Sequence, residues 1–311
     1  MTTIGPSFTG VGATRRSIAN EDRDGRLLLN VHLVDGTYEL FRQYYGRLRF
    51  AKDDASPYEA AAGVLHSILE MIENGATHIG VATDHVIESF RNDLWADYKT
   101  GAGIDPSLWA QFHPLEDALV AMGVVVWPMV DLEADDALAA AARIAGADTS
   151  VQRVSIWTPD KDLAQCVRGT RVVQVDRRGG EIRDEAAIRR KFGVAPELIP
   201  DYLALVGDAQ DGFPGVRGIG KVTAAKLLNL HGALEVFPES VLGERRERAL
   251  LFKTLATLRA EEPLFERADE LLWRGPNDEL AAWAQRMDDD RLMERAQQAV
   301  DSRERGGRVT T

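Results

Sequence analysis

Acidic residues that directly follow apolar runs constrain this chain of 311 residues more than any other feature. Asp35 ends the run LLLNVHLVD, Asp84 ends HIGVATD and Asp160 ends VSIWTPD. Each run has the length and composition of a buried β-strand. In a parallel α/β sheet the carboxyl ends of the strands form one rim, where ligands bind. We therefore expect these aspartates to lie together.

Further carboxylates are expected near the same rim, because EADD opens a predicted helix and would present its acids there. The residues that we predict to bind metal are Asp35, Asp84, Glu133, Asp135, Asp136, Asp160, Asp162, Asp208 and Asp211. Like charges can crowd one cleft only if cations neutralise them, and hard oxygen ligands select Mg²⁺ or Mn²⁺. Any one of these acids alone could simply end a strand or cap a helix. Together they predict a hydrolytic site with two or more divalent ions.

Composition excludes several other classes of protein. Cys166 is the only cysteine, so the chain can form neither an intrachain disulfide nor a thiolate zinc site. No apolar run is long enough to span a membrane, and the N-terminus lacks the apolar core of a signal peptide. We expect a cytoplasmic protein. The net charge of −12 means that any nucleic acid would have to be bound by local basic patches.

Strands and helices alternate along most of the chain, which predicts an α/β fold with a mostly parallel sheet flanked by helices. We expect strands near 27–34, 78–82, 123–128, 151–158 and 171–175, and helices from 38 and near 58–74, 106–122 and 135–145. We divide the chain into a disordered N-terminal tail (1–26), a catalytic domain (27–195), a DNA-binding subdomain together with C-terminal helices (196–298) and a disordered tail (299–311).

The segment 85–114 is longer than the loops that usually join such elements. It combines the cations Arg91 and Lys99 with aromatic residues that include Tyr98. Cations interleaved with aromatic rings beside acidic ligands indicate a gateway that holds phosphates and stacks bases. An ordinary amphipathic surface helix is the alternative.

The sequence GVRGIG lies between two predicted helices after residue 196. Gly215, Gly218 and Gly220 would allow backbone N–H groups to approach a phosphate at the N-terminus of the second helix. Lys221 and Lys226 add charge without base specificity, which favours the backbone of duplex DNA as ligand. A simple turn between packed helices is the alternative.

These motifs resemble, in order, those of the 5′-nuclease family of flap endonucleases and of the 5′→3′ exonuclease domain of bacterial DNA polymerase I. The matching segments are VDGTYELFR, ATDHVIESFRNDLWADYK, LEADDALA, TPDKDL and GDAQDGFPGVRGIGKVTAAKLL, within about residues 27–260. The resemblance implies a PIN-like sheet, a helical arch over 85–114 and a helix-three-turn-helix (helix-hairpin-helix) subdomain.

The resemblance also implies roles for individual residues. One metal ion would be held by Asp35, Asp84, Glu133 and Asp135, and a second by Asp135, Asp160, Asp162 and Asp208, with Asp136 and Asp211 as outer or water-mediated ligands. Arg91 and Lys99 match the gateway residues that contact the scissile phosphate. Phe41 matches an aromatic that stacks on the terminal base, although core packing is an equal alternative.

The implied activity is that of a stand-alone, structure-selective 5′ nuclease, acting as flap endonuclease and 5′→3′ exonuclease to leave 5′-phosphate and 3′-hydroxyl ends. Its expected partners are DNA with 5′ flaps, 5′ ends or nicks, together with replication or repair proteins, and we expect a monomer near the nucleoid. The family also suggests K⁺ at the helix-hairpin-helix.

The chain departs from the family pattern at Ala102, Gln210, Gly212 and Val222, and these departures bear on gateway grip, duplex affinity and the K⁺ site. Two other functions stay open at this point. One is an RNA-cleaving PIN-like nuclease, and the other is a protein that binds branched DNA without cutting it.

Overall fold

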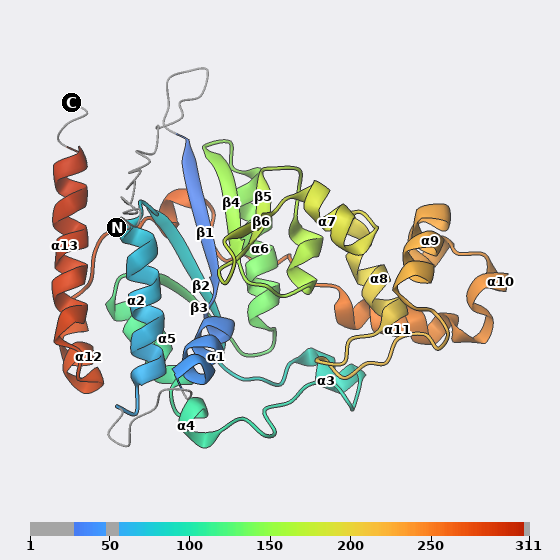
Figure 1. Cartoon of the computed structure of the whole chain (residues 1–311), viewed down its shortest axis with the longest axis horizontal. Coiled ribbons are helices and arrows are strands. Elements are labelled where there is room, and N and C mark those ends of the chain that lie inside the picture. Colours follow the sequence, from blue (N-terminus) through green and yellow to red (C-terminus); the bar gives the residue numbers. More distant parts are fainter. Residues whose placement is uncertain (1–27, 48–55, 308–311) are drawn as a thin grey trace, which may run out of the picture.

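A six-stranded sheet forms the centre of the structure, a computed structural model that describes residues 28–47 and 56–307 (Figure 1). The predicted tail 1–26 lies outside the described residues. The strands are β1 (Leu29–Asp35), β2 (His78–Asp84), β3 (Val125–Met129), β4 (Val151–Trp157), β5 (Val172–Asp176) and β6 (Glu181–Arg183). Their order in the sheet is β3-β2-β1-β4-β5-β6. The predicted α/β class is therefore confirmed.

All neighbouring strands are parallel except β6, which pairs antiparallel with β5 at one edge. β1 lies in the middle, where Asp35 pairs in register with Ala82 of β2. The prediction missed β6, because a strand of three residues carries too little periodicity to be recognised. Strands β1 to β5 lie close to the predicted ranges.

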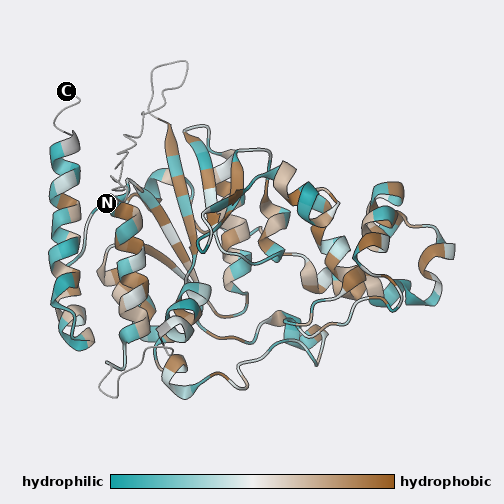
Figure 2. Ribbon diagram, viewed as in Figure 1, coloured by the Kyte–Doolittle hydropathy of each residue, from teal (hydrophilic) through white to brown (hydrophobic). Residues whose placement is uncertain are grey.

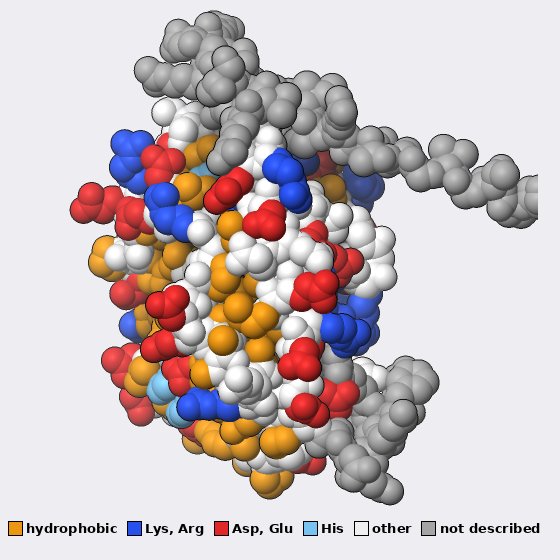
Figure 3. All heavy atoms as spheres, turned by 90° about the vertical axis from the view of Figure 1, so that its left-hand side faces the viewer, with side chains coloured by type: hydrophobic (Ala, Val, Ile, Leu, Met, Phe, Trp, Pro, Cys, Tyr) orange, Lys and Arg blue, Asp and Glu red, His pale blue; other side chains and the backbone are white. Residues whose placement is uncertain are grey.

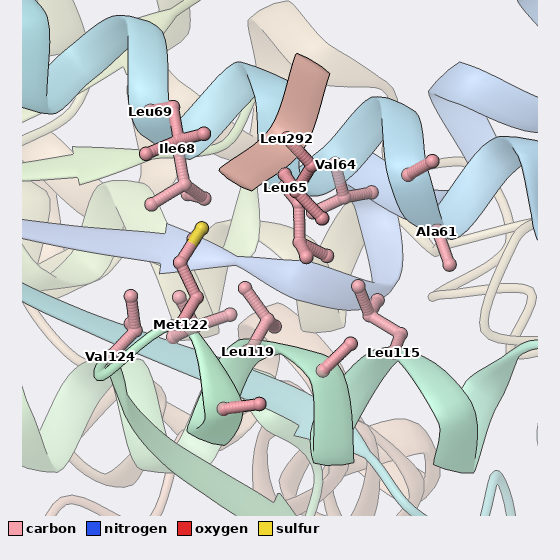
Figure 4. Packing of buried hydrophobic residues seen from close by; sticks show 14 of the residues in the cluster. Ala61, Val64, Leu65, Ile68, Leu69, Leu115, Leu119, Met122, Val124 and Leu292 are labelled. Atoms are coloured by element: carbon pink, nitrogen blue, oxygen red, sulfur yellow. The ribbon is translucent and has the colours of Figure 1, made fainter. Parts of the chain in front are cut away.

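Helices cover both faces of the sheet, as a parallel sheet requires. The helices of this part are α1 (Gly36–Arg47), α2 (Glu59–Glu73), α3 (Phe90–Leu94), α4 (Pro106–Trp109), α5 (Phe112–Ala121) and α6 (Ala134–Ala147). One hydrophobic cluster joins the sheet to α2 and α5, and another joins it to α6. Figure 4 shows Leu65 and Ile68 of α2 facing Leu119 of α5 and the nearby Met122.

A helical lobe lies at one end of the sheet (Figure 1). It contains α7 (Glu185–Phe192), α8 (Ile199–Val206), α9 (Lys221–His231), α10 (Glu239–Leu242) and α11 (Arg246–Ala256) around its own hydrophobic cluster. The predicted pair of helices around GVRGIG is α8 and α9. Figure 2 shows the apolar strands of the sheet and the alternation of apolar and polar residues along these helices.

The last two helices correct the predicted division of the chain. α12 (Leu280–Met287) and α13 (Asp290–Gly307) do not belong to the helical lobe but pack beside α2 at the opposite end of the molecule (Figure 1). Leu292, Ala296 and Ala299 are buried in the same cluster as α2 and α5. The predicted subdomain 196–298 therefore ends before α12, because the apolar side of α13 packs on the helices that cover the sheet.

The predicted tail 299–311 is also corrected, since α13 continues to Gly307. Arg303 donates hydrogen bonds to the carbonyl oxygens of Trp273 at 2.7 Å and Ala76 at 2.8 Å, which ties this turn of the helix to the body of the protein. Of the predicted tail 299–311, residues 308–311 lie outside the described residues. Figure 3 shows this end of the molecule, where apolar side chains are surrounded by charged ones. Within the described residues, no helix has both the length and the apolar content needed to cross a bilayer.

We expect Leu292→Ala to destabilise the protein by about 2–4 kcal/mol, because it removes a fully buried side chain and leaves a cavity between α13 and α2. The midpoint of urea unfolding followed by circular dichroism measures the effect. Arg291→Ala on the same helix is the control, since the Arg291 side chain is 81% exposed. Equal midpoints for the two variants would show that α13 is not part of the folding unit.

Candidate metal centre and nucleic-acid interface

The carboxyl ends of β1, β2 and β4 present Asp35, Asp84 and Asp160 at one rim of the sheet. Asp35 accepts hydrogen bonds from the backbone N–H of Tyr38 at 2.8 Å and from the hydroxyl of Thr158 at 3.0 Å. Asp84 accepts one from the backbone N–H of Ala134 at the start of α6, at 2.9 Å. Backbone and hydroxyl donors thus orient these carboxylates while leaving lone pairs for a cation.

A second group of carboxylates forms where the helical lobe meets the sheet. One oxygen from each of Asp162, Asp208 and Asp211 lies within 4.8 Å of the others, and all three residues are buried. Asp162 starts the short 3₁₀ helix η1 (Asp162–Cys166), and its backbone N–H donates to Asp160 at 2.9 Å. Asp208 and Asp211 belong to the turn after α8. This turn and the sheet rim therefore build one acidic centre together.

Two lysines lie inside the acidic centre. Lys99, from the segment after α3, places its ammonium 2.7 Å from Glu133 and 3.5 Å from Asp211. Lys161 pairs with Asp208 and lies 3.8 Å from Asp162. The two lysines thus compensate part of the negative charge of the acidic centre. The sequence motifs did not single out Lys161, although its position between two predicted ligands in TPDKDL was a usable signal.

Burial and mutual repulsion disfavour the charged state of several carboxylates. Burial raises the pKa of Asp35 to about 7, with further increases from the charges of Asp84 and Asp160. Burial likewise raises the pKa of Asp211 to about 6, although Lys99 opposes the shift. Negative charge in the centre is thus under-compensated by the protein's own cations. A bound cation would reverse these shifts by stabilising the ionised carboxylates.

The remaining shifts have the same physical cause. The pKa values of Asp135 and Asp162 are raised far above the usual range by burial and then by the charge of Asp160. Glu133 is the exception, because Lys99 and Arg91 outweigh the effect of its burial and lower its pKa. Oδ1 of Asp162 is buried and accepts no hydrogen bond from any described residue. An oxygen of this kind suits direct contact with a metal ion, so the donor set fits hard divalent cations.

Asp136 is not available as a metal ligand, which corrects the prediction. Its side chain is fully buried, and Arg91 donates to its two oxygens at 2.8 and 2.7 Å. The backbone N–H groups of Glu133 and Arg259 donate to it at 3.0 and 2.8 Å. Four hydrogen bonds occupy both oxygens. Asp136 therefore anchors the start of α6 instead of binding a cation.

Arg91 is likewise not a phosphate contact in this structure. Its side chain is 1% exposed, and besides Asp136 it donates to Glu133 at 3.1 Å and to the carbonyl of Leu255 in α11 at 2.8 Å. The motif FR therefore ties the gateway segment to α6 and to the helical lobe. Sequence reasoning could not distinguish a buried arginine from an exposed one, because both occur beside acidic residues.

The aromatic residues of the gateway are also mostly packed. Tyr98 is buried, and its hydroxyl donates to Glu133 at 3.4 Å, so it is not free to stack on a base. Trp95 donates to the carbonyl of Gly212 at 3.0 Å, which fixes the segment to the turn that carries Asp211. Both predicted gateway cations contact Glu133, but only the Lys99 side chain is open to solvent, at 32% exposed against 1% for Arg91.

Phe41 lies on α1, where its ring is partly packed in the core and partly lines a pocket. One edge packs on Phe112 with ring centroids 6.0 Å apart. The ring also lines a pocket of about 470 Å³ together with Tyr38, Tyr45 and Arg178. The pocket offers aromatic surface beside a cation, next to the rim that carries Asp35.

The hairpin between α8 and α9 exposes part of the predicted phosphate site. Gly218 and Gly220 are exposed and precede α9, and Lys221 and Lys226 are exposed on that helix. Gly215 has a different role from the predicted one, because it is buried and a Cβ there would collide with the backbone of Gly207. Its positive φ of 71° and this close approach make glycine necessary for packing the two helices.

Comparison with known proteins agrees with this arrangement. Residues 30–193 match the N-terminal resolvase-like domain of 5′-3′ exonucleases, and residues 194–279 match their C-terminal SAM fold. The chain belongs to the 5′-3′ exonuclease family. The resemblance inferred from the sequence motifs is therefore confirmed.

Relatives in this family include a 5′-3′ exonuclease and several proteins named DNA polymerase I. The 5′-3′ exonuclease of Buchnera aphidicola is 34% identical over 213 residues, which are 67% of this chain and 68% of that protein. DNA polymerase I of Pseudomonas aeruginosa is 34% identical over 259 residues, which are 77% of this chain. The chain spans only 28% of the length of that polymerase.

Solved structures share the fold at lower identity. The bacteriophage T5 protein co-crystallized with metal ions has a TM-score of 0.64 at 16% identity, covering 88% of this chain and 98% of that one. A complex of the T5 flap endonuclease with DNA and metal ions has a TM-score of 0.60 at 18% identity, with the same coverage. The fold of this 5′-3′ exonuclease family member is therefore that of known 5′ nucleases.

The metal-free protein should lose stability as the pH rises. The pKa of Asp35 is raised from 3.8 to about 7, so the folded state holds a proton that the unfolded chain has already released. The contribution of Asp35 to the free energy of unfolding is therefore largest below pH 3.8, and it is lost as the pH rises to about 7. We expect the melting temperature in EDTA to fall between about pH 5 and pH 8, with a shallower fall for Asp35→Asn. Identical slopes in calorimetry would contradict the assignment of this proton to Asp35.

Proposed function

We propose that this protein is a divalent-metal-dependent, structure-selective 5′ nuclease that hydrolyses DNA at 5′ flaps, 5′ ends and nicks. The observation that carries the proposal is the buried carboxylate centre shared between the sheet rim and the turn after α8. This turn leads directly into the exposed hairpin before α9. Only a few residues therefore separate the proposed site of hydrolysis from the proposed site for DNA phosphates.

We assign two cation sites within the centre. The first comprises Asp35, Asp84, Glu133 and Asp135, and the second comprises Asp135, Asp160, Asp162 and Asp208, with Asp211 beside it. Mg²⁺ or Mn²⁺ fits this all-oxygen set, and such a pair of ions, when bound, supplies an activated water and stabilises the leaving oxygen. The burial of Asp162 and the raised pKa values of Asp135 and Asp162 support the assignment.

The protein's own groups would position the reacting phosphate. Lys99 enters the centre from the gateway and is 32% exposed, so its ammonium can transfer from Glu133 to an incoming phosphate without leaving the site. The hydrogen bonds that Tyr38 and Thr158 donate to Asp35 fix that carboxylate before substrate arrives. Such preorganisation lowers the cost of reaching the transition state.

The DNA would lie along the surface from the pocket at Phe41 to the hairpin. Gly218 and Gly220 leave the N-terminus of α9 open to a phosphate, and Lys221 and Lys226 add positive charge there. The pocket lined by Phe41 and Tyr38 can receive an unpaired base. By resemblance to the family, K⁺ would bind at this same turn. A monomer acting near the nucleoid with replication or repair proteins belongs to the same proposal.

Asp160→Asn should abolish most cleavage while leaving the fold intact. Asparagine retains an oxygen that can accept the hydrogen bond from the N–H of Asp162, but it lacks the charge that holds a cation. We expect the rate on a labelled 5′-flap duplex in Mg²⁺ or Mn²⁺ to fall by at least about 100-fold. The melting temperature and flap binding in EDTA should stay close to those of the wild type. A variant that cleaves at the wild-type rate would refute the second cation site.

Lys99→Ala should slow cleavage far more than it weakens binding. The lysine acts where the scissile phosphate would lie, so we expect single-turnover rates to fall by about 100-fold with less than a threefold change in affinity. Lys226→Ala is the matched control, because its side chain is exposed on α9 away from the acidic centre. It should weaken duplex binding and leave the single-turnover rate at saturation unchanged. Equal losses of rate and affinity for Lys99→Ala would make Lys99 only an anchor for DNA.

Matched DNA and RNA flaps separate this proposal from the other two functions. Preferential cutting of the RNA flap would favour an RNA-cleaving nuclease. Binding of flaps without product in either metal would identify a non-catalytic binder of branched DNA.

A further inference from the structure

Lys161 occupies the part of the acidic centre that the second cation would need. Its ammonium pairs with Asp208 and lies 3.8 Å from Oδ1 of Asp162, the buried oxygen that accepts no hydrogen bond from any described residue. Both carboxylates belong to the group of three whose oxygens approach within 4.8 Å. The lysine is thus held among the ligands and does not extend into solvent.

The chain geometry explains why this lysine points inward. Asp160 turns the chain at the end of β4, where its carboxylate accepts the N–H of Asp162 and its carbonyl accepts a hydrogen bond from Gln174. Lys161 lies between these two aspartates and follows the turn, and its side chain is 26% exposed. A flexible stem of four carbons can carry the ammonium into the centre or release it to solvent.

An ammonium and a divalent ion cannot share these ligands. At such short separations their repulsion is strong even with the effective dielectric of a protein surface. Binding of the second cation would therefore be an exchange in which the lysine leaves. The apparent affinity for that cation would be reduced by the interaction that the lysine gives up.

We propose that Lys161 is a tethered counter-ion that neutralises the second cation site in the metal-free protein and must be displaced for that site to load. This inference rests on the proposed function, since it requires a second cation site. Its consequence is that the lysine stabilises the metal-free fold and raises the metal concentration at which the second site fills. Lys99 differs, because it contacts Glu133 and Asp211 on the side of the gateway.

Metal binding without substrate tests the proposal independently of cleavage. Metal-stripped protein is titrated with Mn²⁺, and the free ion is measured by electron paramagnetic resonance, which resolves a tight and a weak site. For Lys161→Met we expect the weak site to bind about tenfold more tightly, with the tight site unchanged. The melting temperature in EDTA should fall, and the increase on adding Mn²⁺ should be larger than in the wild type.

Two further variants serve as controls. Lys161→Arg keeps the positive charge and should retain weak binding at the second site. Lys253→Met removes a lysine that pairs with buried Asp201 at 2.8 Å and with Glu235 at 2.7 Å, outside the acidic centre. It should lower the melting temperature without changing Mn²⁺ affinity. If Lys161→Met does not fold, Lys161→Gln carries the same expectation, because it removes the charge and keeps polar groups.

The outcomes distinguish this inference from the proposed function. Unchanged or weaker Mn²⁺ binding by Lys161→Met, with two sites in the wild type, overturns the counter-ion role and leaves the nuclease proposal standing. Wild-type protein that binds no Mn²⁺ at millimolar concentration overturns both. Tighter binding in Lys161→Met and not in Lys253→Met supports the inference.

Discussion

Mutual repulsion among buried carboxylates is the constraint on which the rest of this structure depends. Asp35, Asp135 and Asp162 all have raised pKa values because burial and their neighbours disfavour the charged state. The fold brings them together because three parallel strands end at one rim and because the turn after α8 closes over it. Lys99 and Lys161 offset part of this charge within the protein. Cations would offset the rest, so stability and metal binding are linked in this centre.

Arg91 and Asp136 come from two different motifs and form a buried ion pair beside the acidic centre. Their buried, bidentate pair joins the gateway segment, α6 and the segment after α11. Removing one partner of such a pair leaves an uncompensated buried charge, which strongly destabilises the folded protein. The pair therefore holds Glu133 and Lys99 at the mouth of the centre. Both residues lie in segments that resemble family motifs, and their charged groups are satisfied by partners within the protein.

The two ends of the molecule contain different hydrophobic clusters. The helical lobe carries the hairpin and the turn with Asp208 and Asp211, and Trp95 fastens the gateway segment to that turn. At the other end α13 completes the apolar cluster over α2. Rigid packing at both ends keeps the rim between them fixed, and such fixed groups favour catalysis because little reorganisation remains.

The sequence by itself determined the α/β class, the positions of β1 to β5 and the family, because strand-ending aspartates and apolar runs are local features. It also indicated which acids could meet at a rim. Only the tertiary structure decided that Asp136, Arg91 and Tyr98 are buried partners and that Gly215 serves packing. The return of α12 and α13 to the sheet's helices, like the inward position of Lys161, was also decided there. Burial and pairing depend on side chains distant in sequence, and a periodic pattern cannot specify which charges face one another.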